Sequence, residues 1–78
     1  MNTVDRGRRL RVARAHANIP EVRLAQMVGA TPNQLRSWCR GTTLPSDYMI
    51  DRLADALNVP RTWLRSGWRS EYTTRIAA

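Results

Sequence analysis

The stretch "GATPNQLRSWCRG" at residues 29–41 carries the clearest structural signal in the chain. At about 100° per residue, a helix that begins at Pro32 separates its polar side chains from its apolar ones. Leu35 and Trp38 point to one side, and this side is predicted to pack against an apolar core. The opposite side is a polar stripe formed by Asn33, Arg36, Ser37 and Arg40.

The four prolines of the chain mark the starts of further short helices. Proline suits the first turn of a helix because its missing N–H would have no partner there. In "NIPE" at 18–21 and "NVPR" at 58–61, an asparagine that can end one helix precedes a proline that begins the next. Thr31 and Ser46 are expected to cap the two helices between these points. The predicted helices span roughly residues 5–17, 20–28, 32–40, 46–57 and 60–66.

The second and third predicted helices are joined by a very short connection. Only Gly29 and Ala30 precede the Thr31 cap, and so tight a connection forces the two helices to cross steeply, as in a helix-turn-helix. Apolar residues three and four positions apart predict the core-facing side of the other helices. Tyr48 and Trp63 are expected in the core or in an interface. The predicted fold class is therefore all-α, with five helices.

Length and charge limit the function classes. The 78 residues suffice for one domain with a small core. Thirteen basic residues against six acidic ones give a net charge of +7, which indicates a polyanionic partner. The sequence shows neither a signal peptide nor the roughly 18 apolar residues of a membrane helix. With Cys39 as the single cysteine, no intrachain disulfide forms, and a cytoplasmic protein is expected.

No set of residues indicates catalysis, a metal or a cofactor. There is no nucleophile with a neighbouring base, no pair of carboxylates in a pocket and no Gly-rich phosphate loop, so an enzyme is not expected. One cysteine and one histidine cannot supply the about four ligands of a structural zinc site. Cys39 is expected to be a small, partly buried apolar residue, with a redox switch as the alternative. His16 is expected on the surface, and no small-molecule effector is evident.

Three segments in order resemble the Cro/lambda-repressor-like, or XRE-type, helix-turn-helix proteins. "GRRLRVAR" at 7–14 is similar to the first helix of that family, and "LAQMVGATPNQLRSWCRG" at 24–41 is similar to its helix-turn-helix. "LPSDYMIDRLADALNVPRTWL" at 44–64 resembles its fourth helix and the start of its fifth. The resemblance implies a five-helix domain whose third helix enters the major groove of double-stranded DNA.

The polar stripe then acquires a chemical interpretation. Arginine can hydrogen-bond guanine, asparagine can hydrogen-bond adenine, and serine can bond several base edges. Residues early in a recognition helix reach bases, while those near its end more often meet the backbone. We assign base readout to Thr31, Pro32, Asn33, Arg36 and Ser37, and phosphate contacts to Arg14, Arg40, Thr42 and Thr43. An ordinary solvated helix face is the alternative for the stripe.

Two positions depart from the family pattern. The family usually has glutamine where this chain has Glu21, and that glutamine contacts a phosphate and neighbouring recognition groups. A carboxylate facing phosphate would be repulsive, so either Glu21 turns away or the docking differs locally. The family often has glutamate where this chain has Cys39, and that glutamate pairs with the arginine of the first helix. Arg14 is therefore expected to lose its usual partner and to be freer to meet phosphate.

The tail "GWRSEYTTRIAA" at 67–78 has a different pattern. Its residues alternate with the period of a strand and are rich in strand-favouring types. A single strand is not stable alone, so pairing with a second copy of the chain is expected, with a frayed terminus as the alternative. The predicted dimerisation residues are Trp68, Tyr72, Thr74 and Ile76. The expected division is a DNA-binding domain at 1–67 and a tail at 68–78.

Together these patterns predict a DNA-binding transcriptional regulator. The simplest hypothesis is a Cro-like repressor, of phage or prophage type, that occludes a promoter by binding a palindromic operator as a homodimer. An antitoxin or the control protein of a restriction system would share all of these features. A protein-interaction module that keeps the fold without operator binding is the alternative from another class, and Glu21 is the residue that favours it most.

Overall fold

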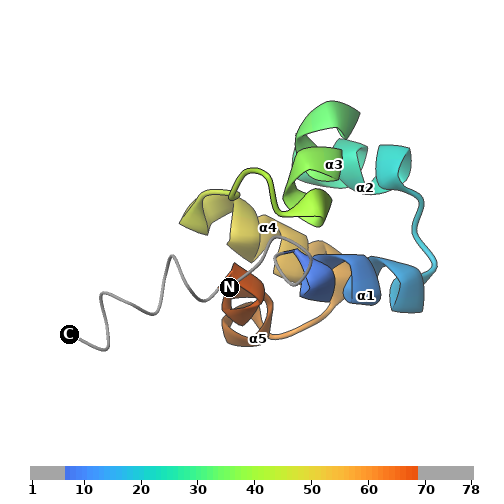
Figure 1. The fold of residues 1–78 in the computed structure, drawn as a ribbon. Helices are drawn as coiled ribbons and strands as arrows, with labels where there is room; N and C mark the ends of the chain where they lie inside the picture. The colour runs from blue at the N-terminus through green and yellow to red at the C-terminus, as the bar shows by residue number, and fades with distance from the viewer. Residues whose placement is uncertain (1–6, 69–78) are drawn as a thin grey trace.

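The computed structural model describes residues 7–68, and every regular element in this range is helical (Figure 1). The elements are α1 (Arg8–Ala17), α2 (Glu21–Val28), α3 (Pro32–Arg40), α4 (Asp47–Leu57), α5 (Arg61–Arg65) and a closing 3₁₀ turn, η1 (Ser66–Trp68). The all-α fold class is confirmed, and the bounds of α2 to α5 lie within one residue of those predicted. Within residues 7–68, no helix has both the length and the hydrophobicity needed to cross a membrane.

The asparagine–proline signals end and begin the helices as predicted, with a shift of one residue. Asn18 and Asn58 adopt left-handed φ angles of 59° and 57° and end α1 and α4. Pro20 and Pro60 are N-caps instead of first helical residues, because their ψ angles of 155° and 134° are still extended. Ser46 caps α4, because its hydroxyl accepts a hydrogen bond from the backbone N–H of Met49 at 3.1 Å.

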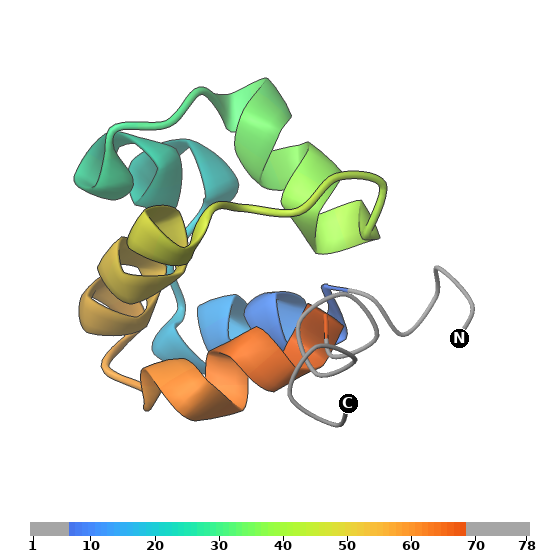
Figure 2. The same ribbon diagram turned by 90° about the vertical axis from the view of Figure 1, so that its left-hand side faces the viewer.

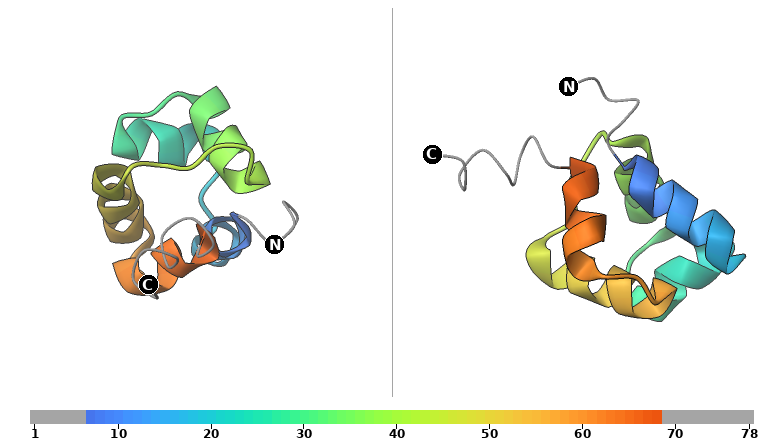
Figure 3. Two further views of the ribbon diagram at one scale, coloured as in Figure 1. Left: turned by 60° about the vertical axis from the view of Figure 1, so that its left-hand side comes forward. Right: turned by 90° about the horizontal axis from the view of Figure 1, so that it is seen from below.

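The helices form two groups that are linked through α1 and α4. α2 and α3 lie together at one end of the molecule, and α5 lies at the other (Figures 1 and 2). α1 packs against α3, α4 and α5, and α4 packs against α2 and α5. In the further views α4 lies between the two groups (Figure 3). In this arrangement α1 and α2 support α3.

The core is built from the apolar stripes that the sequence predicts. The side chains with no exposed surface are Leu10, Leu24, Leu35, Ile50, Leu53, Leu64 and Trp68. Each of the five helices contributes at least one of them. Because full burial of a large apolar side chain stabilises by about 1.5–3 kcal/mol, this cluster is the main term that holds five short helices together.

The start of α1 presses directly on the end of α3. Gly7, the N-cap of α1, has a φ of 77°, a value that side chains with a Cβ rarely adopt. A Cβ on Gly7 would lie 2.1 Å from the carbonyl oxygen of Trp38. Glycine is therefore required at this position both for its conformation and for its size, and the contact fixes how closely α1 approaches α3.

The structure changes the interpretation of two aromatic residues. Trp68 ends η1 and has 0% exposed surface, so it belongs to the core of its own chain instead of starting a dimerisation strand. The core therefore continues through residue 68 and does not end at 67. Tyr48 is not in the core, since it is 67% exposed, and it lies beside Arg52; of its two predicted places, the interface remains. Trp63 packs partly buried against the core, as expected.

The remaining predicted dimerisation residues, Tyr72, Thr74 and Ile76, lie outside the described residues. Their predicted role in dimerisation stays a prediction. Trp68 is explained instead by the brevity of α5, whose five residues cannot close the core alone.

Trp68→Ala is expected to lower the free energy of unfolding by about 3–5 kcal/mol, because it removes a fully buried aromatic side chain. Urea unfolding followed by circular dichroism measures the change. Trp68→Phe keeps much of the apolar volume and should cost less. An unfolding midpoint for Trp68→Ala equal to that of the wild type would show that this side chain does not support the core.

Candidate nucleic-acid interface

A tight turn and a double cap position the start of α3. Gly29 ends α2 with a φ of 76°, which turns the chain sharply toward α3. Thr31 then forms a capping box with Gln34. The Thr31 hydroxyl accepts from the backbone N–H of Gln34 at 3.1 Å, and the Gln34 side chain accepts from the backbone N–H of Thr31 at 2.9 Å. These paired bonds satisfy two free N–H groups, so the first turn of α3 has a defined geometry.

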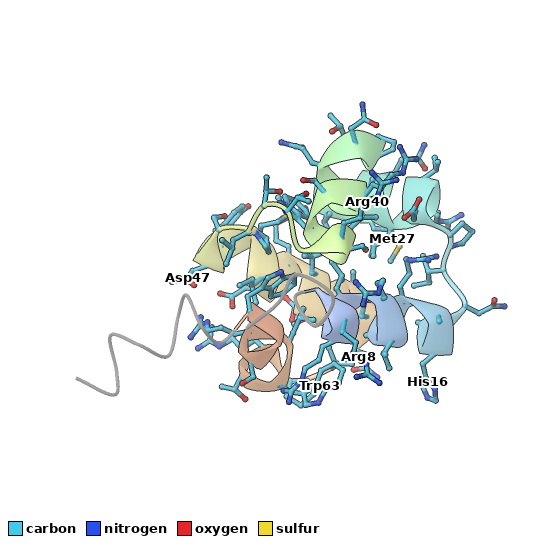
Figure 4. All side chains as sticks on the ribbon, in the orientation of Figure 1. Arg8, His16, Met27, Arg40, Asp47 and Trp63 are labelled. Atoms are coloured by element: carbon cyan, nitrogen blue, oxygen red, sulfur yellow. The ribbon has the colours of Figure 1, made fainter. Side chains whose placement is uncertain are left out.

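Burial of one side of α3 fixes which residues face outward. Leu35, Trp38 and Cys39 are 0%, 7% and 3% exposed. The opposite side carries the predicted polar stripe, and polar side chains surround this free part of α3, with Arg40 toward its C-terminal end (Figure 4). Three members of the stripe, Asn33, Arg36 and Arg40, are exposed, and Ser37 is half-buried. Thr31 and Pro32 are exposed at the start of the same helix.

The stripe is organised by side-chain contacts around Arg36. Its Nη1 donates a hydrogen bond to Oδ1 of Asn33 at 3.1 Å. Its Nε lies 3.6 Å from Oε1 of Glu21, the first residue of α2. The side chains of Arg36 and Glu21 are 44% and 31% exposed. Glu21 therefore neither turns away nor stands alone, because it pairs with a residue of the stripe.

Three hydroxyl groups gather at the C-terminal end of α3. The Ser37 hydroxyl lies 2.7 Å from that of Thr42 and 2.7 Å from that of Thr43. The Thr42 hydroxyl also donates to the backbone carbonyl of Ser37 at 3.1 Å. The structure thus brings together two of the predicted phosphate contacts and one predicted base contact. Each hydroxyl has a single proton, so a bond to a phosphate oxygen would replace one of these internal hydrogen bonds.

Two arginines of α1 donate hydrogen bonds to backbone carbonyls outside their own helix. Nη1 of Arg11 donates to the carbonyl oxygen of Cys39, a group that the helix itself leaves unpaired. Nη1 of Arg14 donates to the carbonyl oxygen of Ile19 at 3.0 Å, and, against the larger effect of burial, the charge of Arg14 lowers the pKa of Cys39. Arg14 thus lacks the glutamate of the family pattern, but it is not unengaged, because the Ile19 carbonyl accepts a hydrogen bond from its Nη1.

Cys39 has the surroundings of an unreactive thiol. It is buried, and burial raises its pKa above the ordinary value of 9.0 despite the nearby Arg14, which lowers it. Thiolates, not thiols, are the reactive form of cysteine. The structure thus favours the interpretation of Cys39 as a packed apolar residue over that of a redox switch.

Sequence reasoning missed two contacts of this region. The Glu21–Arg36 pair joins two helices, and the sequence signal for it was an acidic residue opening one helix and a basic one in the next. The bond from Arg11 to α3 had no comparable signal, because arginines at four neighbouring positions of α1 were indistinguishable before the helix was placed.

The described geometry is that of a helix-turn-helix DNA-binding domain, with a rigidly anchored second helix whose outer side is polar. The sequence matches the Helix-turn-helix family over residues 10–64, from α1 to the fourth residue of α5. The chain belongs to this family, and it is of the Cro/lambda-repressor-like, XRE type. It is therefore a DNA-binding regulator. A comparison with curated proteins finds no match.

Cys39 is expected to react slowly with iodoacetamide in the folded protein at neutral pH, since burial blocks access and raises the pKa of the thiol. Mass spectrometry of samples with and without denaturant measures the two rates. Because the folded pKa is the higher one, the stability that this group contributes is full below the unfolded pKa and is lost as the pH rises through the folded pKa. Equal alkylation rates in the folded and unfolded chain would contradict the buried position.

Proposed function

We propose that the protein is a transcriptional repressor that recognises one double-stranded DNA sequence with α3 and occludes a promoter by occupying it. The observation that carries the proposal is the exposed stripe on a helix whose rotation is fixed by Leu35 and Trp38. A net charge of +7 supports a polyanionic partner. The stripe combines the side chains that recognise guanine and adenine edges.

Base readout is assigned to the first two turns of α3. Asn33 and Arg36 are exposed and already joined by a hydrogen bond, so they would meet the major groove as one unit. Ser37 is the third reader, one turn further along. Thr31 and Pro32 stand at the N-terminal end of α3, where recognition helices approach base edges. The Thr31 hydroxyl accepts its capping bond and keeps its proton for a base, and the Pro32 ring suits a thymine methyl group.

Phosphate contacts are assigned to the far end of α3 and to the loop that follows. Arg40 is exposed at this end, and the hydroxyls of Thr42 and Thr43 lie beside it through their bonds with Ser37. Arg14 is a weaker member of the group, because it is half-buried and its Nη1 is engaged by the Ile19 carbonyl. Its remaining N–H groups are the ones that a phosphate would bond.

A two-fold dimer is the form in which we expect the protein to bind. One recognition helix offers a handful of base contacts, which is little for specific affinities of about 10⁻⁸ M or tighter. Two copies on half-sites one helical turn apart would double the contacts and require a palindromic operator. Tyr72, Thr74 and Ile76 retain the strand-like alternation that suits pairing of two identical segments.

The competing function, docking on a protein without DNA binding, loses its main support. It rested on an acidic Glu21 facing a phosphate. The carboxylate instead pairs with Arg36, so the surface around the stripe is not acidic at this point. Salt dependence separates the two functions, because binding through phosphates weakens steeply with salt.

Asn33→Ala and Arg40→Ala are expected to weaken DNA binding in two different ways. Asn33→Ala should cost about 1–3 kcal/mol on the sequence that the wild type enriches from a random pool, and it should relax the preference at one base position. Arg40→Ala should weaken all sequences about equally and lower the log–log salt slope by about one per lost contact. Fluorescence anisotropy on enriched and scrambled duplexes at several salt concentrations measures both.

The solvent-exposed His16, at the end of α1, provides a matched control. His16→Ala should leave base preference and salt slope unchanged. If Asn33→Ala behaved like His16→Ala, the stripe would not read bases, and binding by the wild type that did not depend on salt would contradict the use of phosphate contacts.

Removal of residues 69–78 is expected to abolish dimerisation and to weaken operator binding while the helical content stays the same. The truncation keeps Trp68, because that side chain belongs to the core. Analytical ultracentrifugation measures the oligomeric state, and circular dichroism checks the fold. A truncated chain that still dimerised would move the interface to the surroundings of Trp63. Full affinity of a monomeric wild-type protein for a single half-site would contradict the dimer itself.

A further inference from the structure

Glu21 occupies an unusual place for an acidic residue in a domain with this charge. It lies at the first position of α2 and is tied to the DNA-facing stripe by the Arg36 Nε–Glu21 Oε1 contact of 3.6 Å. With Asn33 bonded to Nη1 of Arg36, the guanidinium is held on two sides. Among residues 7–68, Nη2 of Arg36 makes no hydrogen bond, so its N–H groups are available to a ligand.

The carboxylate changes what Arg36 can bind. A free arginine beside a DNA groove is drawn to the nearest phosphate whatever the sequence, since charge attraction carries no base information. Because its carboxylate lies beside the guanidinium, Glu21 offsets part of that attraction. The N–H groups of Nη2 and the second N–H of Nη1 remain, and a pair of such donors matches the O6 and N7 acceptors of guanine. The preference of Arg36 for a base edge over a phosphate therefore increases.

We propose that Glu21 is a specificity-determining residue that weakens binding to arbitrary DNA by holding Arg36 away from phosphates and available for a base edge. This inference rests on the proposed function. It assigns discrimination to a repulsive element as well as to attractive ones, which is a general route to specificity. Glu21 acts through Arg36 and is in this sense a positioning residue.

A purely structural role for Glu21 predicts a different effect of its substitution. A carboxylate in the first turn of a helix stabilises it through the helix dipole, and its loss would then alter the melting temperature without altering the choice of DNA. The ratio of affinities for enriched and scrambled DNA distinguishes the two roles.

The test compares Glu21→Gln with the wild type on the duplex that the wild type enriches from a random pool and on a scrambled duplex of equal length. Glu21→Gln is expected to raise affinity for scrambled DNA about fivefold and to steepen the salt slope by about one per bound chain. Affinity for the enriched duplex should rise by less than about twofold, because the lost positioning of Arg36 toward the base edge offsets its stronger attraction to phosphate. The specificity ratio therefore falls.

Asp55→Asn is the matched control for charge. Asp55 is an exposed carboxylate on α4, so the variant changes the net charge by the same amount away from the stripe. It should change both affinities equally and by less than about twofold, because screening weakens charges beyond about 10 Å at ordinary salt. A control that reproduced the Glu21→Gln result would reduce the effect to net charge and overturn the proposal.

A double-mutant cycle with Arg36→Gln shows whether Glu21 acts through Arg36. In the Arg36→Gln background, Glu21→Gln is expected to leave both affinities unchanged. A persistent rise there would mean that the carboxylate repels phosphate directly, and this would overturn the role of Arg36. Normal DNA binding by the wild type with an unchanged specificity ratio in Glu21→Gln would overturn this inference alone. Failure of the wild type to bind any duplex would overturn the proposed function as well.

Discussion

The burial of Leu35, Trp38 and Cys39 along one side of α3 is the constraint on which the DNA-facing surface depends. A helix of nine residues is marginal by itself in water, and its rotation would be undefined without tertiary contacts. Once this side is enclosed by α1 and α2, every other position of α3 is determined by the 3.6-residue repeat. The exposed stripe is therefore a consequence of core packing, and its chemistry was free to vary without changing the fold.

Much of the fold could be predicted because its signals are local. The left-handed Asn18 and Asn58, the prolines that follow them and the Thr31 cap act within a few residues, and the structure shows them where the sequence placed them. The polar stripe followed from the same reasoning, since one apolar anchor on α3 determines the opposite side.

The parts that could not be predicted are contacts between residues far apart in the chain. Trp68 alternated with polar residues and so had the pattern of a strand, yet a short α5 and an unfilled core required it inside the domain. Nothing local distinguishes a tryptophan that pairs strands from one that closes a core. The Glu21–Arg36 pair is similar, because long side chains on separate helices meet only once the crossing of the helices is known.

Many of the arginines also make contacts within the fold, a role that the net charge does not reveal. Four arginines donate to backbone carbonyls across the fold: Arg9 to Trp63, Arg11 to Cys39, Arg14 to Ile19 and Arg52 to Val28. Two more, Arg61 and Arg65, pair with the α4 carboxylates Asp51 and Asp47. Long cationic side chains can cover apolar surface and still bond a distant carbonyl, which suits a domain with so few large apolar residues.

Charge in this domain is therefore divided between internal ties and the DNA-facing surface. Arg40 lies at the C-terminal end of α3. Arg36 lies on the same helix, and the carboxylate of Glu21 pairs with its positive charge. A sequence-level count treats every arginine as part of one electrostatic footprint. The DNA-facing surface that we propose holds few positive groups, so the identity of each hydrogen-bond partner would contribute more to recognition than the total charge does.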